Sequence, residues 1–357
     1  ARETGFPVTS TLMGLGAFPA SDPQWLGMLG MHGSFEANSA MHDCDLMIAV
    51  GARFDDRVTG RLDAFSPGSK KVHIDIDPSS INKNVRVDFG VVGDCTEVLD
   101  ALVEEWRRRN AQEDYEFART RSWRSRINEW RAKKSFGYER AQNAIKPQYA
   151  IERLFALTRG RDVYVTTEVG QHQMWAAQHF HFDQPNRWMT SGGLGTMGYG
   201  LPAAIGVQAA HPDALVIDIA GDASVQMTMQ EMSTAVQHEL PVKIFILNNA
   251  YLGMVRQWQE LLHGGRYSHS YSASLPDFVK LAEAYGGVGI RAETPDELDA
   301  KIMEMIEVRR PVLFDCVVTQ EENVFPMIPS GAAHNEMLFG GHHVTGDEVS
   351  DEGKALV

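Results

Sequence analysis

The sequence is poor in cysteine and has no long apolar run. Its three cysteines, Cys44, Cys95 and Cys316, are widely separated and form no CxxC pair, which argues against both a disulfide-rich secreted scaffold and a cysteine metal site. No apolar stretch approaches the roughly 20 residues that a membrane span requires, so no membrane partner is expected. Basic residues number 33 against 47 acidic ones, for a formal net charge of −14. This balance predicts no nucleic-acid partner, because neutralising phosphates needs clustered Lys and Arg.

The start of the sequence also lacks an initiator methionine, an apolar signal segment and an Arg- and Ser-rich transit segment. Residues 1–5 look instead like the end of a helix capped by Gly5, and residues 6–11 begin a strand. We therefore expect the chain to begin inside a domain. The sparse cysteines predict a cytoplasmic location, or an organellar one if the source is eukaryotic.

The sequence does contain short apolar runs that alternate with helical patterns, in two blocks. In the first block, short buried strands are predicted over residues 45–51 and 71–77, and a helix follows from Thr96. Such runs favour parallel sheets that are covered on both faces. The predicted fold class is α/β, with two doubly wound parallel-sheet domains over residues 1–105 and 146–320. The strands of the second block are expected over residues 162–167, 214–220, 242–247 and 312–318.

Residues 106–145 interrupt this alternation with Arg, Lys and Trp. Basic residues interleaved with Trp could form a nucleic-acid element, but glutamates are mixed through the stretch. We therefore predict a charged helical linker that packs its Trp side chains inward. Residues 321–357 are rich in Gly, His and acidic residues, and a C-terminal tail with a disordered end is predicted there.

Polar residues follow two of the predicted strands of the second block. Strand 214–220 leads into Gly221-Asp222 and then a helix over 227–236, and strand 242–247 ends in Asn248-Asn249. One helical crossover between adjacent parallel strands would bring Asp222 and Asn249 to the same sheet edge. Mg²⁺ prefers such oxygen ligands and accepts substrate phosphates as others. We predict metal ligation by Asp222, Asn249 and the main-chain carbonyl of Tyr251.

The same loop would bind a diphosphate. Gly221 permits close approach of the backbone, and the N–H groups of Ala223 and Ser224 would open a helix that attracts the anion. A Gly-Asp pair after a strand is, taken alone, most often a turn and a helix cap. The strand context, the spacing of some 25 residues and the Asn-Asn pair favour the metal site.

These residues resemble the thiamine-diphosphate motif of pyruvate-decarboxylase-like enzymes. Three flanking strings, over residues 170–175, 191–206 and 253–258, are similar to the catalytic large subunit of acetohydroxyacid synthase, also called acetolactate synthase. The resemblance covers nearly the whole chain. It implies that residues 1–105 are a partial middle domain that binds FAD, and that residues 146–320 are the thiamine-diphosphate and Mg²⁺ domain.

The resemblance assigns roles to individual residues. It places the apolar side chain of Met197 beneath a bent cofactor, Met254 beside it, and Trp258 at the pocket for the second ketoacid, with Arg57 near the substrate. Without the surrounding strings, such methionines would be taken for ordinary core residues, and His172 for a loop histidine. The positions implied to line the thiamine and diphosphate are Val169, Gly170, Gln171, His172, Gly195, Met227, Gly253, Met254 and Val255.

The loop Gly51–Val58 follows a strand and alternates Arg53 and Arg57 with Asp55 and Asp56. Taken alone, it is either a surface salt-bridge loop or a set of forked phosphate donors beside carboxylates that hold hydroxyls. The resemblance implies an FAD site with a structural role. Its positions are Thr11, Leu12, Gly30, Met31, His32, Gly51, Arg53, Asp55, Arg57, Val58, Asp75, Ile76, Gly93 and Asp94, with Gln173, Met174 and Gly192 from the second domain.

The implied activity is that of a transferase: pyruvate is decarboxylated on thiamine diphosphate, and the two-carbon unit condenses with pyruvate or 2-ketobutyrate in branched-chain amino acid synthesis. Implied partners are a second copy in a homodimer or homotetramer and a small regulatory subunit. The family's N-terminal domain, with its catalytic glutamate, has no counterpart here, so we expect a partial chain that is inactive alone. Two alternatives remain: another carboligase or oxidase of the superfamily, and a non-catalytic cofactor-binding module.

Overall fold

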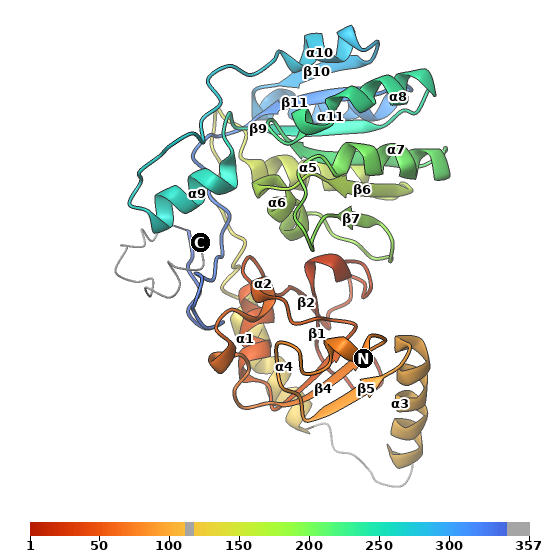
Figure 1. Ribbon diagram of the computed structural model, residues 1–357, viewed down its shortest axis with the longest axis vertical. Coiled ribbons are helices and arrows are strands. Elements are labelled where there is room, and N and C mark those ends of the chain that lie inside the picture. The colour runs from red at the N-terminus through yellow and green to blue at the C-terminus, as the bar shows by residue number, and fades with distance from the viewer. Residues whose placement is uncertain (111–117, 341–357) are drawn as a thin grey trace.

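The computed structural model describes residues 1–110 and 118–340, which form two α/β parts (Figure 1). In the first part, two parallel strands form one small sheet and three more form another, in the order β3-β4-β5. The elements are β1 (Val8–Ser10), η1 (Leu12–Gly14), β2 (Trp25–Met28), α1 (Phe35–Asp43), β3 (Leu46–Val50), α2 (Asp56–Thr59), η2 (Leu62–Ala64), β4 (Lys70–Asp75), η3 (Pro78–Ser80), β5 (Phe89–Val92), α3 (Cys95–Asn110) and α4 (Ala118–Arg131).

The second part is built on a six-stranded parallel sheet in the order β10-β11-β9-β8-β6-β7. Along β8, Ile217 and Ile219 belong to one apolar core and Val216 and Ala220 to another, so both faces of the sheet are buried, as the unbroken apolar runs predict. The strands are β6 (Val163–Thr167), β7 (Trp188–Thr190), β8 (Leu215–Gly221), β9 (Lys243–Asn248), β10 (Val288–Ala292) and β11 (Val312–Val317). The helices are α5 (Pro147–Thr158), α6 (Gln171–His179), α7 (Gly200–Ala210), α8 (Met232–Gln237), α9 (Gly253–Leu262), α10 (Phe278–Ala284) and α11 (Pro295–Glu307).

The strand β3 is less buried than its apolar sequence predicts. Leu46, Ile48 and Val50 are 41%, 41% and 40% exposed, while Met47 and Ala49 pack into a small core. β3 is an edge strand, paired with β4 alone among the described residues. An apolar run does not tell which faces of a strand are covered, so the prediction of a buried strand is wrong here.

The helix predicted over 227–236 is also wrong at its start. Two 3₁₀ turns, η4 (Val225–Met227) and η5 (Met229–Glu231), precede α8. The Ser224 hydroxyl donates to the Gly221 carbonyl and accepts from the Gly221 N–H, and the Thr228 hydroxyl donates to the Gly198 carbonyl. These side-chain bonds compete with the α-helical ladder. A turn at residues 222–224 therefore leads into the 3₁₀ helix η4, with Ser224 as its N-cap, and the α-helix begins only at Met232.

The basic stretch between the parts contains α4. Trp123 and Trp130 pack with Ile127 in one apolar cluster that also includes residues of α1, and Arg126 lies over the Trp130 ring, 5.0 Å from its centroid. Residues 111–117 of the predicted linker lie outside the described residues. No helix within residues 1–110 and 118–340 has both the length and the apolar character needed to cross a lipid bilayer.

Residues 321–340, which we call the C-terminal strap, run from the second part to the first (Figure 1). The Gln178 amide donates to the carbonyls of His32 and Phe325, at 2.9 and 3.2 Å. The Ile328 N–H donates to the Met31 carbonyl at 2.8 Å. The strap thereby joins both parts. Residues 341–357 of the predicted tail lie outside the described residues.

Two buried histidines fasten this strap, and we expect acid to loosen it. His32 Nδ1 lies 3.1 Å from the Pro326 carbonyl, and His334 Nε2 lies 2.7 Å from the Val58 carbonyl. Burial lowers the pKa of each ring to about 4, whereas an unfolded histidine titrates near 6.5. Between these values the unfolded chain binds more protons, so the free energy of unfolding falls as pH drops from about 6.5 to 4, by up to about 1.4 kcal/mol per pH unit for each ring.

The measurement is urea unfolding at pH 7, 6, 5 and 4.5, for the wild type and for His334→Gln. Glutamine can donate to the Val58 carbonyl but does not titrate, so its unfolding free energy should depend less on pH. Equal pH dependence of the two proteins would contradict this account.

Candidate cofactor site

Three loops of the second part meet where β6, β8 and β9 end. These strands are neighbours in the sheet and run parallel, so their carboxyl ends share one edge, the usual ligand position in open α/β sheets. The loops enclose a cleft with about 470 Å³ of empty space. Its lining includes fourteen of the predicted positions: Val169, Gly170, Gln171, His172, Met197, Gly221, Asp222, Ala223, Ser224, Asn249, Tyr251, Gly253, Met254 and Val255.

Asp222 is the charged group in this lining. It is 1% exposed, and its Oδ2 has no hydrogen-bond partner. Burial raises the pKa of Asp222 to about 7, although backbone N–H groups stabilise the carboxylate. A buried carboxylate oxygen without a partner is costly. A cation beside Oδ2 would remove that cost, so the site fits a metal.

Of the two asparagines, Asn249 lines the cleft and Asn248 does not. Asn249 Oδ1 accepts the Tyr251 N–H at 3.1 Å, which turns the chain after β9. Asn248 Nδ2 instead donates to Asp315 of the neighbouring β11 at 2.9 Å. No group of three or more His, Cys, Asp or Glu within residues 1–110 and 118–340 could hold a metal by itself. A cation here would depend on one carboxylate, neutral oxygens and a phosphate-bearing ligand, as Mg²⁺ sites often do.

Two glycines are required by close approach. A Cβ at Gly221 would lie 2.7 Å from His172 Nδ1, and one at Gly253 would lie 2.0 Å from Gln171 Oε1. His172 is buried, and burial lowers its pKa to about 3. The ring is therefore neutral and serves as packing for the Gly221 backbone rather than as a cation for a phosphate.

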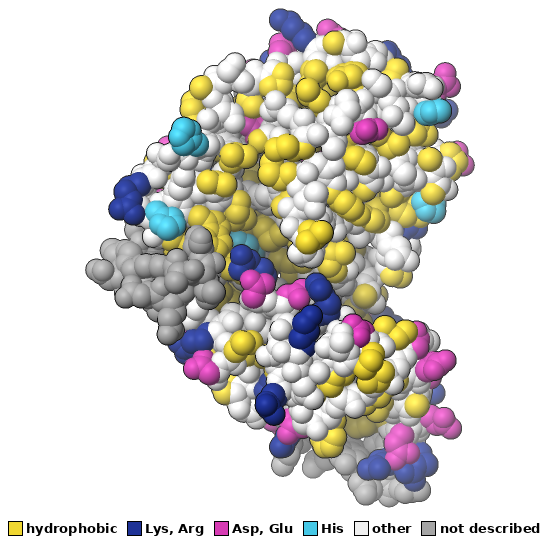
Figure 2. Space-filling model, in the orientation of Figure 1, with side chains coloured by type: hydrophobic (Ala, Val, Ile, Leu, Met, Phe, Trp, Pro, Cys, Tyr) yellow, Lys and Arg dark blue, Asp and Glu magenta, His cyan; other side chains and the backbone are white. Residues whose placement is uncertain are grey.

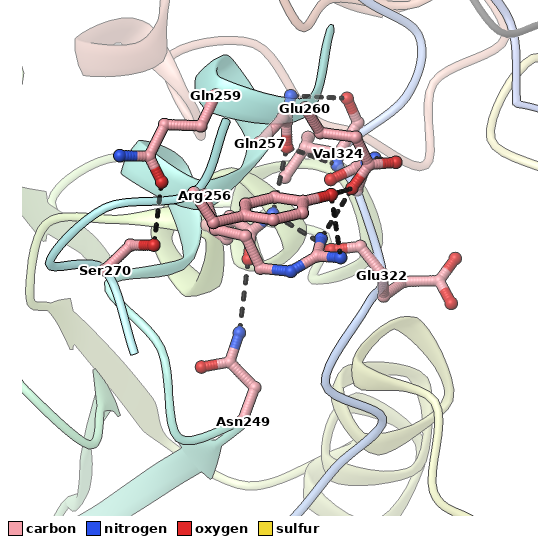
Figure 3. Close-up of polar contacts among 11 residues, drawn as sticks. Asn249, Arg256, Gln257, Gln259, Glu260, Ser270, Glu322 and Val324 are labelled. Atoms are coloured by element: carbon pink, nitrogen blue, oxygen red, sulfur yellow. Dashed lines mark hydrogen bonds and ion pairs between the residues drawn. The ribbon is translucent and has the colours of Figure 1, made fainter. Parts of the chain in front are cut away.

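A buried amide network connects the cleft to α9 and to the strap (Figure 3). Asn249 Nδ2 donates to Gln171 Oε1 at 3.3 Å, and Gln171 Nε2 donates to Gln257 Oε1 at 2.9 Å. Gln257 Oε1 also accepts the Val324 N–H at 2.8 Å. Beside it, Arg256 pairs with Glu260 at 2.7 Å. Asn249, the helix that carries Met254, and the strap thus form one bonded unit.

Three of the positions predicted for thiamine diphosphate or the substrate lie outside the cleft lining, as do the predicted flavin positions Gln173, Met174 and Gly192. Gly195 lies beside Val169, with its Cβ position 3.8 Å from Val169 Cγ1. Met227 is 54% exposed and touches Gly198. Trp258 packs with Met31 and strap residues, under the Arg57 guanidinium 5.9 Å from its ring centroid. The lining residues that the sequence reasoning did not assign are Trp175, Leu247 and Leu252. Their apolar side chains carry no signal that separates them from core.

The predicted flavin positions of the first part fall into neighbouring groups. The Met31 N–H donates to the Arg57 carbonyl at 2.8 Å, and the Gly93 N–H donates to the Asp75 carbonyl at 3.1 Å. A Cβ at Gly192 would lie 3.5 Å from Leu12 Cδ2. The other predicted positions of the first part lie in the loops that follow its strands or beside the residues just named: Thr11, Gly30, His32, Gly51, Arg53, Asp55, Val58, Ile76 and Asp94. In the second part, the Gln173 amide donates to the Thr190 hydroxyl, and Met174 packs against the apolar core.

The arginines of the Gly51–Val58 loop pair with neighbouring carboxylates. Arg53 bonds Asp55 at 2.8 Å and Arg57 bonds Asp56 at 3.0 Å, all with exposed side chains. A second hollow, with about 520 Å³ of empty space, lies against this loop and is lined by Met31, Arg57 and Val58 together with strap residues. Figure 2 shows Lys or Arg and Asp or Glu side chains at the constriction where the two parts of the molecule meet.

Comparison with known protein families agrees with this architecture. Residues 168–316 match the model of the thiamine pyrophosphate enzyme C-terminal TPP binding domain, and residues 1–102 match the model of the central domain of the same enzymes. The chain therefore belongs to the thiamine pyrophosphate enzymes.

Within this class, the chain is homologous to large subunits of acetolactate synthase. It is 50% identical over 343 residues to the acetolactate synthase large subunit of Haemophilus influenzae, covering 95% of this chain and 58% of that protein. It is 52% identical over 334 residues to the isozyme 3 large subunit of Escherichia coli K12, covering 93% and 58%. The mitochondrial catalytic subunit of Saccharomyces cerevisiae is 46% identical over 345 residues, covering 93% and 49%. The chain thus spans about half to three fifths of the length of these relatives.

Proposed function

We propose that this chain holds Mg²⁺ and thiamine diphosphate for acetolactate synthesis, in which pyruvate loses carbon dioxide and its two-carbon unit joins pyruvate or 2-ketobutyrate. The observation that carries the proposal is the buried, unpartnered Oδ2 of Asp222 in the cleft where β6, β8 and β9 end. The names of the relatives give the reaction class.

The residues around the cleft would have different roles. Asp222, Asn249 and the Tyr251 carbonyl would hold Mg²⁺, and the backbone at Gly221, Ala223 and Ser224 would meet the diphosphate. Met197 and Met254 supply an apolar wall that excludes water from the reacting end of the cofactor. Thiamine diphosphate, when bound, supplies a thiazolium that accepts the electron pair left by decarboxylation. Trp258 and Arg57, stacked on each other, would shape the pocket for the second ketoacid and meet its carboxylate.

FAD is the second proposed cofactor. The glycine-rich turns at residues 30, 51 and 93 and the Arg53–Asp55 pair border one side of its site, and Gly192 and Gln173 border the other. Its role would be structural, because the main reaction transfers no net electrons. We further propose a homodimer or homotetramer, a small regulatory subunit, and a cytoplasmic or organellar location.

Titration calorimetry of the 357-residue chain tests the proposal. We expect binding of thiamine diphosphate with Mg²⁺ and none when Mg²⁺ is removed by EDTA. Binding that does not depend on a divalent cation would contradict the assigned site. An oxidase of the same superfamily would instead reduce a quinone or oxygen with pyruvate, which a quinone-reduction assay detects.

A further inference from the structure

A buried glutamate lies between two walls of the cleft. Glu168 follows β6 directly, is 0% exposed, and stands immediately before the lining residues Val169 and Gly170. Its carboxylate accepts the N–H of Gly198 at one oxygen and the N–H of Leu201, at 3.2 Å, at the other. It thus bonds the turn that carries Met197, at the point where α7 begins.

A second buried carboxyl group stands behind this bond. Asp218 of β8 is 0% exposed, accepts the Thr166 hydroxyl at 3.2 Å, and leaves its Oδ2 without a partner. Burial, then the charge of Glu168, raise the pKa of Asp218 well above its usual range. Burial also raises the pKa of Glu168, but the N–H groups of residues 198–201 oppose it. Glu168 has backbone N–H donors that favour its charged form, whereas Asp218 has only the Thr166 hydroxyl, so Glu168 is the member of the pair better suited to carry a negative charge.

Contacts around Met197 leave little freedom for a different arrangement. A Cβ at Gly200 would lie 2.1 Å from Asp218 Oδ1, and one at Gly198 would lie 3.0 Å from Met227 Cβ. The Thr166 hydroxyl is also 3.0 Å from the Gly200 carbonyl. The turn that carries Met197 thus contacts β6, β8 and the η4 turn. Of these contacts, the one made by Glu168 is a charge-assisted hydrogen bond.

We infer that Glu168 is a positioning residue. By binding the backbone of residues 198–201 to the end of β6, it fixes the position of Met197 relative to residues 169–172 on the opposite wall of the cleft. It thereby determines how well the thiamine part of the cofactor fits. The inference rests on the proposed binding of Mg–thiamine diphosphate. Asp222 and Asn249 are separate from this bond, so the metal and diphosphate part of the site should not depend on Glu168.

Binding of two different ligands can distinguish a positioning role of Glu168 from a general role in stabilising the fold. Mg–thiamine diphosphate needs the Met197 wall, whereas Mg–pyrophosphate needs only the Asp222 end. Dissociation constants for both are measured by calorimetry on the 357-residue wild type, Glu168→Gln, Asp218→Asn and Met197→Ala. For Glu168→Gln we expect a loss of roughly tenfold or more in thiamine diphosphate affinity, as befits a lost charge-assisted bond, and unchanged Mg–pyrophosphate affinity.

Asp218→Asn is the matched control. Because burial and the neighbouring Glu168 disfavour the charged form of Asp218, a neutral amide of the same shape should change both affinities by less than about twofold. In the double variant Glu168→Gln, Met197→Ala, the losses should be less than additive, since one acts through the other. If Glu168→Gln does not fold, Glu168→Asp, which withdraws the carboxylate by one methylene, is measured in the same way with the same expected pattern.

Equal loss for both ligands in the Glu168 variants, or no loss for either, would overturn the positioning role while leaving the proposed function standing. A wild-type chain that binds Mg–pyrophosphate but not Mg–thiamine diphosphate would overturn the proposed function and this inference with it.

Discussion

Asp222→Asn should abolish Mg²⁺-dependent binding of thiamine diphosphate, raising its Kd by roughly 100-fold or more, while making the ligand-free chain more stable. Removing groups that only orient a metal's ligands already lowers metal affinity by roughly 10- to 100-fold. Asp222, the carboxylate in the cleft lining, is proposed to be a ligand itself, so its loss should have a larger effect. In the absence of a cation, burial disfavours the charged form of Asp222 and its Oδ2 has no hydrogen-bond partner, so a neutral amide should be better tolerated there. The same buried, unpartnered carboxylate oxygen would thus bind the metal and lower the stability of the ligand-free chain.

The matched control is Asp213→Asn. Asp213 is exposed and stands before the other end of the same strand, β8, so neither binding nor stability should change measurably. Calorimetry gives the Kd, and thermal unfolding with and without Mg–thiamine diphosphate gives the stabilisation. A ligand-induced rise in Tm that survives in Asp222→Asn would show that another group carries the metal.

Gly200→Ala should destabilise the second part of the chain by more than about 2 kcal/mol, whereas Gly206→Ala on the same helix should be neutral or stabilising by about 0.4–1 kcal/mol. At Gly200 a methyl group would meet Asp218 Oδ1 at 2.1 Å and the backbone of residues 167 and 168 at 2.7 Å. These are strand atoms and a buried carboxyl group, which cannot move aside cheaply. At Gly206 the added methyl group meets nothing within 4 Å.

Both glycines lie in α7, so helix propensity acts in the same direction on both variants and only the contacts differ. Urea unfolding followed by tryptophan fluorescence measures the difference. Similar unfolding free energies for the two variants would show that the approach of α7 to β6 and β8 is looser than described.

The sequence predicted those structural features that are determined by residues close together in the chain. The apolar strands 214–220 and 242–247 correspond to β8 and β9, and the polar residues after them lie around one cleft because parallel strands end at one edge. The α/β class followed from the same runs. Gly221 could be singled out from its place directly after a strand, and Gly253 from a string that resembles a family, but the reason for them, contact with His172 and Gln171, is a matter of tertiary structure.

What the sequence could not predict depends on contacts between distant segments. Glu168 immediately precedes the predicted cofactor positions 169–172, yet nothing local shows that it binds residues 198–201. The strap at 321–340 mixes polar and apolar residues without a clear helical or strand pattern, and its contacts with residues 31, 58 and 257 distinguish it from a loose tail. The interruption before α8 comes from Thr228 reaching Gly198 across the cleft rim, which competes with a good helical pattern.

The exposed edge strand β3 determines how this chain would behave in concentrated solution. Its outer edge offers N–H and C=O groups that no other described strand pairs, and three aliphatic side chains, Leu46, Ile48 and Val50, are exposed on one face of the same strand. An unpaired apolar edge is a template for intermolecular strand addition. Self-association of the chain by itself would therefore begin at β3, which belongs to the first part of the chain, whereas the cleft is lined by residues of the second part. A single charged residue at position 48 would act as a gatekeeper against it.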